Sequence, residues 1–258
     1  MPLHRTQAIV IRRYPLGEAD RLVAFYTREF GRLTGVAKGA RRPRSRFGGA
    51  LELFTQGQLL FFESERWELV RVDHFDILSP FVRVRESLPR LGQGAWVVEC
   101  VARLTAERDP HASFYGLLVR TLGALERSIM PERVRLAFML RAMDLLGYRL
   151  RLDRCRQCGR PPGPAPRLDF TAGGLVCGEC AWLPGDSVPL SGAAVAVLRR
   201  LRTLAWGELL VAHLSRSVES QIVAALEAQV VRILGQPFKT PRFLAQTQRD
   251  LVAEGRLR

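Results

Sequence analysis

Short runs of β-branched and aromatic residues recur through the first 79 residues, separated by turn sequences rich in glycine, proline and acidic residues. Runs of this length and composition predict β-strands. We expect five strands, at Thr6–Ile11, Arg21–Thr27, Gly31–Lys38, Leu51–Glu63 and Trp67–Leu78. A sheet this small has exposed edges unless it closes on itself, so the pattern predicts a barrel.

From Pro80 onward the apolar positions follow a helical period. Two predicted helices have apolar faces formed by Trp96, Val97, Val101 and Leu104, and by Phe114, Leu117, Leu118, Leu122 and Leu125. A third begins at Pro131, ends near Gly147 and is apolar on nearly every face, which predicts that it is buried. Two more are expected after Ser191, and from Ser215 to Gly235, because serine caps helix starts and glycine ends helices.

These patterns predict an α+β multidomain protein. Its expected parts are an N-terminal five-stranded barrel (residues 1–79), a helical domain in two parts (80–150 and 186–258), and a cysteine-containing module inserted between them (151–185). The barrel is expected to be of the oligonucleotide-binding (OB) kind. Most of its aromatic residues are expected to fill the interior, and any exposed ones could stack on bases; these are Phe25, Tyr26, Phe54, Phe61, Phe62, Trp67 and Phe75.

Four of the five cysteines form two pairs of the form Cys-x-x-Cys, Cys155 with Cys158 and Cys177 with Cys180. Their separation is typical of a tetrahedral zinc site. Four thiolates leave no open position, so the predicted zinc is structural rather than catalytic. The segment between the pairs is rich in proline and glycine, so the module is expected to depend on the metal for its fold. Gly159 and Gly178 suit the tight turns of such pairs.

Two disulfides, or four unrelated thiols, are the other interpretations of the cysteines. Disulfides are disfavoured because nothing in the sequence suggests secretion. Unrelated cysteines would rarely fall into two matched pairs. The fifth cysteine, Cys100, lies in an apolar run and is predicted to be a small core residue.

The formal net charge is +14, which makes a polyanion the first partner to consider. Only Lys38 and Lys239 are lysine and asparagine is absent, so a codon bias explains arginine in place of lysine. It does not explain 39 basic residues against 25 acidic ones. The position of the basic clusters is therefore more informative than their total.

The clearest basic cluster lies between the third and fourth predicted strands. No acidic residue occurs from Phe30 to Leu51, and glycine, proline and serine there predict a mobile loop whose basic side chains could follow a phosphate backbone. We predict DNA contacts from Lys38, Arg41, Arg42, Arg44 and Arg46. A second cluster, Arg199, Arg200 and Arg202, lies on one face of a predicted helix. It is either a solvated helix face or a patch that binds DNA or a protein partner.

Motifs for common catalytic chemistry are absent from the sequence. There is no phosphate-binding Gly-x-x-x-x-Gly-Lys-Ser/Thr loop, no His-Glu-x-x-His and no Gly-x-Ser-x-Gly, so we do not expect an enzyme. No apolar run reaches the roughly 18 residues that span a membrane, and the N-terminus lacks a signal-peptide core. A cytoplasmic location, associated with the nucleoid, is expected.

Four N-terminal segments together resemble the start of the RecO family of bacterial recombination mediators. They are Ala8-Ile9-Val10-Ile11-Arg12, Gly17-Glu18-Ala19-Asp20-Arg21-Leu22-Val23, Tyr26-Thr27-Arg28-Glu29-Phe30-Gly31-Arg32 and Gly35-Val36-Ala37-Lys38-Gly39-Ala40-Arg41-Arg42. The basic and aromatic tail, Phe238-Lys239-Thr240-Pro241-Arg242-Phe243-Leu244, is similar to the family's closing motif. It departs from the usual Lys-Ser-Arg, and its role stays open.

The resemblance implies an OB barrel that binds single- and double-stranded DNA, anneals complementary strands and acts with the partner protein RecR. It further implies help in loading RecA on strands coated by single-strand binding protein. It assigns Lys38, Arg41 and Arg42 as DNA contacts, because they fall in the family's Ala-Lys-Gly-Ala-Arg-Arg segment. The four-cysteine module is not universal in the family, so the resemblance does not imply that zinc is needed for the activity.

Two other classes of function are compatible with parts of the sequence. A basic barrel with four cysteines also suits a zinc-ribbon RNA-binding or transcription-associated protein, which would prefer structured RNA to single-stranded DNA. A metal-dependent nuclease is disfavoured by the closed thiolate shell and by the lack of a carboxylate cluster, and cleavage with Mg²⁺ or Mn²⁺ would revive it.

Overall fold

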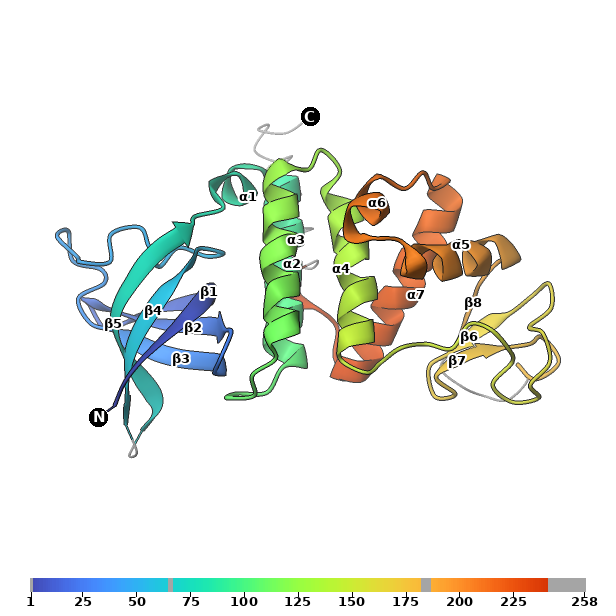
Figure 1. The fold of residues 1–258 in the computed structure, drawn as a ribbon, viewed down its shortest axis with the longest axis horizontal. Helices are drawn as coiled ribbons and strands as arrows, with labels where there is room; N and C mark the ends of the chain where they lie inside the picture. Colours follow the sequence, from blue (N-terminus) through green and yellow to red (C-terminus); the bar gives the residue numbers. More distant parts are fainter. Residues whose placement is uncertain (1, 65–66, 182–186, 241–258) are drawn as a thin grey trace. The chain divides into compact units, whose positions relative to one another are not determined.

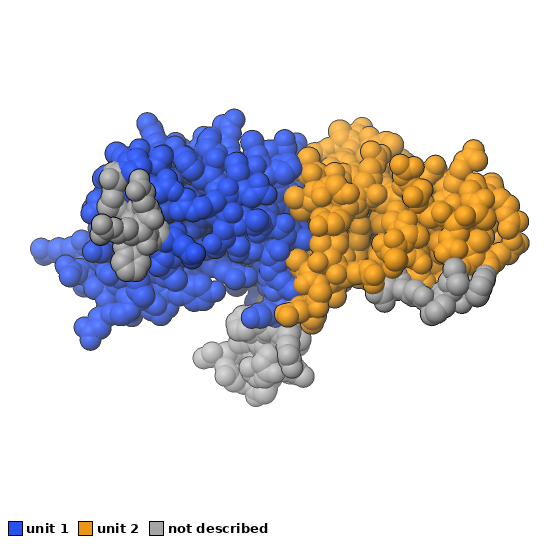
Figure 2. Space-filling model, turned by 90° about the horizontal axis from the view of Figure 1, so that it is seen from below, with its two compact units in different colours: residues 1–132, 238–258 blue, residues 133–237 orange. Residues whose placement is uncertain are grey.

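The structure is a computed structural model that describes residues 2–64, 67–181 and 187–240. The chain forms two compact units, residues 1–132 with 238–258, and residues 133–237, which Figure 2 colours separately. The domain boundaries predicted from the sequence separate the barrel from all the helices. The two units of the structure instead group the first helices with the barrel and the later helices with the cysteine module. Among the described residues, no helix combines the length and the apolar character that a membrane span requires.

The N-terminal unit contains the predicted five-stranded barrel (Figure 1). Its strands are β1 (Leu3–Leu16), β2 (Asp20–Thr27), β3 (Gly31–Ala37), β4 (Gln56–Ser64) and β5 (Trp67–Ser79). They close in the order β1-β2-β3-β5-β4, and β3 with β5 is the one parallel pair among the named strands. The prediction of a small closed barrel is therefore confirmed.

The barrel interior is filled by alternate residues of the five strands, as expected for strands with one face on a core. Its large members include Val10, Val23, Phe25, Leu33, Leu59, Phe61, Val72 and Phe75. Gly35 is required where β3 meets β5, because a Cβ there would lie 2.8 Å from the side chains of Val70 and Val72. Phe25, Phe61 and Phe75 lie in this interior as predicted. Tyr26 and Phe54 are also buried, but they do not belong to the interior cluster.

The fourth strand starts later than the sequence suggests. We expected it from Leu51, but residues 51–55 form turns and β4 begins at Gln56. Leu51 and Phe54 are nonetheless buried, and Phe54 adopts a left-handed backbone with φ of 73°. Their apolar character therefore anchors a loop, and burial alone does not distinguish such an anchor from a strand residue.

Three helices pack beside the barrel in the same unit, α1 (Val82–Glu86), α2 (Leu88–Leu104) and α3 (Ala112–Arg127). The ring of Tyr26 in β2 packs edge-on against Phe114 in α3, with centroids 5.9 Å apart. The Arg32 guanidinium of β3 donates to the carbonyl of Ala102 in α2 at 2.9 Å. Cys100 in α2 is fully buried, which confirms its predicted core role.

The described part of the C-terminal tail returns to α2. Phe238 stacks on Trp96 with ring centroids 4.5 Å apart. The backbone N–H groups of Lys239 and Thr240 donate to the carboxylate of Glu99 at 2.8 and 2.9 Å, and the Thr240 hydroxyl donates at 2.6 Å. The tail thus packs back on the helices, and its predicted segment from Pro241 onward lies outside the described residues.

The second unit contains most of α4 (Pro131–Leu145) together with α5 (Gly192–Thr203), α6 (Trp206–Val211) and α7 (Arg216–Leu234). Ser191 and Ser215 accept bonds from the N–H groups of Ala194 and Val218, at 3.1 and 3.4 Å, so both predicted caps are present. As predicted, α4 is buried along most of its length, through Val134, Leu136, Ala137, Phe138, Met139, Leu140, Ala142 and Met143.

A small sheet accompanies the cysteine pairs in this unit. Its strands are β6 (Arg167–Asp169), β7 (Gly174–Val176) and β8 (Ser187–Pro189), in the antiparallel order β7-β6-β8. The Arg151 backbone bridges to Gly174, which lies directly against it: a Cβ on this glycine would meet the Arg151 carbonyl oxygen. The segment that leads out of α4 is thereby attached to the edge of the small sheet.

Candidate nucleic-acid surface and metal centre

The basic loop, residues 38–55, connects β3 to β4 and carries the predicted DNA-binding residues. It consists of successive turns in which a backbone N–H donates to the carbonyl three residues earlier, as at Arg42 to Gly39 and Ser45 to Arg42. Phe47, Ala50 and Leu51 are buried beneath it in the barrel core. The segment is therefore a succession of turns with buried apolar anchors, and its predicted mobility stays a prediction.

The start of the basic loop is also tied to the turn between β1 and β2. The N–H of Gly39 donates to the Asp20 carboxylate at 2.7 Å, and the N–H of Arg41 donates to the Ala19 carbonyl at 2.9 Å. The Arg41 guanidinium donates to the Gly17 carbonyl at 2.7 Å. The charges of this loop consequently project from a defined scaffold.

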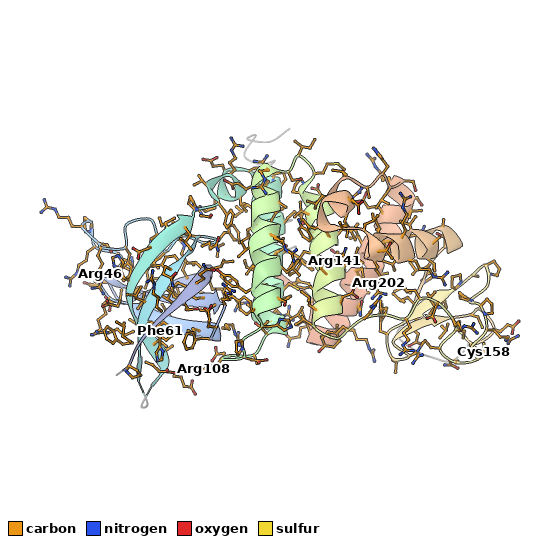
Figure 3. All side chains as sticks on the ribbon, in the orientation of Figure 1. Arg46, Phe61, Arg108, Arg141, Cys158 and Arg202 are labelled. Carbon is orange, nitrogen blue, oxygen red and sulfur yellow. The ribbon has the colours of Figure 1, made fainter. Side chains whose placement is uncertain are left out.

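All five predicted DNA-binding side chains are exposed: Lys38, Arg41, Arg42, Arg44 and Arg46. Figure 3 shows Arg46 beside the barrel, where its guanidinium lies 5.1 Å from the Phe47 ring centroid and 3.9 Å from the Asp73 carboxylate. Across the described ranges, Lys38, Arg42 and Arg44 form no ion pair. Three cations of this loop are therefore available to an external anion.

The fold places further arginines near the basic loop that the sequence analysis did not assign. Arg13 in β1 and Arg21 in β2 both bind the Glu52 carboxylate of the loop, at 2.8 and 3.4 Å. These contacts neutralise the first acidic residue after the basic run. Arg12 lies beside them, at an open concavity of about 500 Å³. The adjacent Arg12 and Arg13 were visible in the sequence, but their position next to the loop depends on strand pairing.

The four predicted metal ligands converge in the second unit. The Sγ atoms of Cys155, Cys158, Cys177 and Cys180 all lie within 4.8 Å of one another. A tetrahedral zinc ion with bonds of about 2.3 Å separates its sulfur ligands by about 3.8 Å, and the Sγ atoms of Cys158 and Cys177 are 3.8 Å apart. The donor set and its spacing fit a tetrahedral metal ion, and all four thiols are free of disulfides.

Backbone geometry holds the cysteine pairs in place. Gly159 has a φ of 73°, as predicted for the first turn, and its N–H donates to the Cys155 carbonyl at 3.0 Å. Gly178 is not among the residues with positive φ, so the predicted conformational need for glycine applies only to the first pair. The N–H of Cys177 donates to the Cys155 sulfur at 3.4 Å. This contact joins the two pairs across the site.

The thiols of the cluster differ in acidity. Desolvation raises the pKa of Cys155, but the backbone N–H groups of Cys158, Cys177 and Gln157 outweigh it and bring that pKa to about 6. The pKa of Cys180 is raised to about 12, first by the sulfur of Cys177 and then by burial. A bound divalent cation would remove this difference, because it stabilises every coordinating sulfur as a thiolate.

Two arginines of the second basic cluster bind other parts of the protein. The Arg199 guanidinium donates to the Leu152 carbonyl at 2.6 Å, and Arg202 binds the Asp144 carboxylate at 2.6 Å. Arg202 also donates to the Leu150 carbonyl. The contacts to Leu150 and Leu152 hold the segment between α4 and the cysteine module, whereas the contact to Asp144 joins α5 to α4. Figure 3 labels Arg202, whose side chain is only 11% exposed. Arg200 is exposed and its guanidinium forms no ion pair with the described residues, so binding of DNA or a partner by this cluster stays a prediction.

Matches to known proteins extend over nearly the whole chain. The model of the family "Recombination protein O N terminal" matches residues 1–81, and that of "Recombination protein O C terminal" matches residues 85–242. A protein of Myxococcus xanthus named DNA repair protein RecO is 34% identical over 250 residues, covering 97% of this chain and all of the relative. A protein of Frankia casuarinae with the same name is 38% identical, covering 89% of this chain and 93% of the relative.

Proposed function

Because this chain belongs to the RecO family, we propose that it acts in DNA repair as a recombination mediator that binds single- and double-stranded DNA and anneals complementary strands. One observation carries the DNA-binding proposal: the anchored basic loop presents Lys38, Arg42 and Arg44 to solvent with no acidic partner among the described residues. Arg41 and Arg46 extend the same surface.

The proposed mechanism needs no catalytic group. Basic side chains that neutralise phosphates release condensed counterions, which supplies affinity independent of sequence. A surface that binds two strands reduces the repulsion between their backbones and so favours pairing. Contacts to base edges are unnecessary, because phosphate contacts position the strand without reading its sequence. We expect such a protein to be located in the cytoplasm, in association with the nucleoid.

The proposed function implies protein partners, and the four cysteines imply a metal ion. The chain would act with RecR to help load RecA on strands coated by single-strand binding protein, and Arg200 with its neighbours Arg199 and Arg202 is a candidate surface for RecR or DNA. We assign zinc to the four cysteines. The closed thiolate shell gives that ion a structural role, since no coordination position is left for water or substrate.

The test is annealing and binding of labelled complementary oligonucleotides across a salt series. The variant Lys38→Glu, Arg42→Glu, Arg44→Glu removes the three unpaired cations and spares Arg41, whose guanidinium supports the loop. We expect duplex affinity to fall and the slope of log affinity against log salt to decrease by about three, because each phosphate contact contributes about 0.9. Annealing should slow in parallel.

A matched control makes the same charge change at exposed arginines elsewhere, Arg83→Glu, Arg154→Glu, Arg216→Glu. Equal losses in both triple variants would show that net charge, not the basic loop, determines binding, and would refute the assignment. Tighter binding to structured RNA than to single-stranded DNA would favour the zinc-ribbon RNA-binding alternative.

A further inference from the structure

The four cysteines of the metal centre differ in their access to solvent. Cys158, which Figure 3 labels, is exposed, and Cys180 is partly exposed. Cys155 and Cys177 are buried, and the Cys155 sulfur accepts the N–H of Cys177. The fifth cysteine, Cys100, is fully buried in the other unit. A small solute therefore reaches the Cys158 sulfur before any other described thiol.

An arginine lies beside this exposed cysteine. The backbone N–H and the guanidinium of Arg160 both donate toward the Cys158 sulfur. The guanidinium also binds the Glu179 carboxylate at 2.6 Å, which holds it at the surface of the module and neutralises part of its charge. Reactive cysteines lie in accessible surroundings of this kind, next to a cation. A guanidinium so placed also stabilises negative charge that develops on a molecule attacked by the sulfur.

A second sulfur lies close to that of Cys158. The Sγ atoms of Cys158 and Cys177 are 3.8 Å apart. A disulfide requires an approach to about 2.05 Å. Gly159, with a φ of 73°, forms the turn directly after Cys158. The two sulfurs therefore need only a short local movement to form a bond.

The core of the cysteine module is made largely of the cysteines themselves. Its buried apolar cluster, with the partly buried residues packed against it, consists of Cys155, Val176, Cys177, Ala172, Cys180 and Ala181. The three strands of the module have three residues each. A module with so few other apolar contacts takes most of its folding energy from the metal that its thiolates bind. Loss of two ligands would remove that energy.

We propose that Cys158 is a site of reversible oxidation by small peroxides, and that its oxidation opens the cysteine module. The Cys158 thiolate attacks one oxygen of hydrogen peroxide, so a sulfur–oxygen bond forms and the oxygen–oxygen bond breaks. The hydroxide that leaves lies near Arg160 and takes up a proton to become water.

The Cys177 thiolate then attacks the sulfur of the resulting sulfenic acid. A sulfur–sulfur bond forms, the sulfur–oxygen bond breaks, and a second hydroxide leaves and is protonated. Two thiolates, one peroxide and two protons thus give one disulfide and two water molecules. Only Cys155 and Cys180 then remain as ligands, which is too few for a tetrahedral site.

The inference rests on the metal assignment made with the proposed function, and peroxide treatment of the full-length protein tests it. Metal content is measured first, and a chromogenic chelator then follows the zinc that leaves the protein. We expect about one equivalent of zinc to leave. Trypsin should then cleave after the exposed Arg154 and Arg156, and dithiothreitol with added zinc should restore resistance. Duplex binding by the basic loop should not change, because that loop belongs to the other unit.

Two variants and a control assign the chemistry to Cys158. Cys158→His keeps four ligands but removes the exposed thiol, so zinc should be retained and its loss to peroxide should slow on the order of tenfold. Arg160→Gln keeps every ligand and should slow the loss about threefold to fivefold, because a contact between exposed groups is weak. Arg154→Gln, at an exposed arginine next to Cys155, should match the wild type. A 1,3-dione probe, which traps sulfenic acids, should label Cys158 in mass spectrometry.

The outcomes separate this inference from the metal assignment. If the untreated protein holds less than about half an equivalent of any metal, the metal assignment fails. If it holds zinc and peroxide does not remove it, only the oxidation proposal fails. Labelling of another cysteine in place of Cys158, or equal rates of zinc loss for the wild type and Cys158→His, would also overturn the proposal. So would a loss that dithiothreitol does not reverse.

Discussion

Glu99 is the residue on which the docking of the C-terminal tail depends. Its residue surface is only 7% exposed, and its carboxylate accepts three hydrogen bonds from Lys239 and Thr240 at 2.6 to 2.9 Å. Arg103, one helical turn later, lies 3.5 Å from the same carboxylate. The perturbation that tests this contact is Glu99→Gln, which keeps the shape and removes the charge.

The expected loss of tail stability in Glu99→Gln follows from the strength of these hydrogen bonds. A bond to a charged group contributes about 1.5–3 kcal/mol. The glutamine amide keeps one acceptor oxygen and turns its NH₂ group toward the remaining donor, so at least one charged bond is lost and the others become neutral. We expect the tail to be destabilised by about 2–4 kcal/mol. At 1.4 kcal/mol per factor of ten, this corresponds to at least about 30-fold.

Hydrogen exchange at the Lys239 and Thr240 amides measures this loss directly, because tail release is a local opening. Glu18→Gln, an exposed position in the same unit, is the control and should leave both amides protected. Unchanged protection in Glu99→Gln would refute the claim that this carboxylate holds the tail.

The pH dependence provides a second check on Glu99. Burial raises the pKa of Glu99, but the Lys239 and Thr240 donors and the Arg103 charge outweigh it, so the net pKa lies below its usual value. A lowered folded-state pKa stabilises the docked tail above the unfolded pKa of about 4.3, and this stability is lost as the pH falls through the folded value. The difference between wild type and Glu99→Gln should therefore shrink below about pH 4.

Two further predictions concern the second unit. Metal analysis of gently purified protein should find about one equivalent of zinc, and less than about half an equivalent of any metal would contradict the assignment. Removal of the metal by a chelator, or the variant Cys177→Ser, should expose the cysteine module to proteolysis while the barrel stays folded. Glu219→Ala should cost about 3–5 kcal/mol in urea unfolding, because it leaves the guanidinium of Arg133, 4% exposed, without the carboxylate that it binds at 2.9 Å. The double variant Arg133→Met, Glu219→Leu should cost less, and equal costs would argue against a buried unpaired charge.

Features that depend on neighbouring residues could be predicted from the sequence. Strand and helix positions follow from the period of apolar residues, and the caps at Ser191 and Ser215 from the chemistry of helix starts. The metal site was predictable for the same reason, since each Cys-x-x-Cys turn orients its own two sulfurs and the module has little else to hold it together. The resemblance to the RecO family rests on continuous motifs and needs no knowledge of contacts.

Contacts between side chains that are distant in the sequence depend on the folded structure and could not be predicted. Leu51 and Phe54 resemble strand residues but anchor the basic loop. Arg199 and Arg202 resemble a surface patch but donate to the Leu152 and Leu150 carbonyls of the segment before the cysteine module. The type of an apolar or charged residue does not show whether its side chain contacts solvent, the core or another side chain. Closure of the barrel arises in the same way, because the pairing of β3 with β5 joins residues that no local pattern connects.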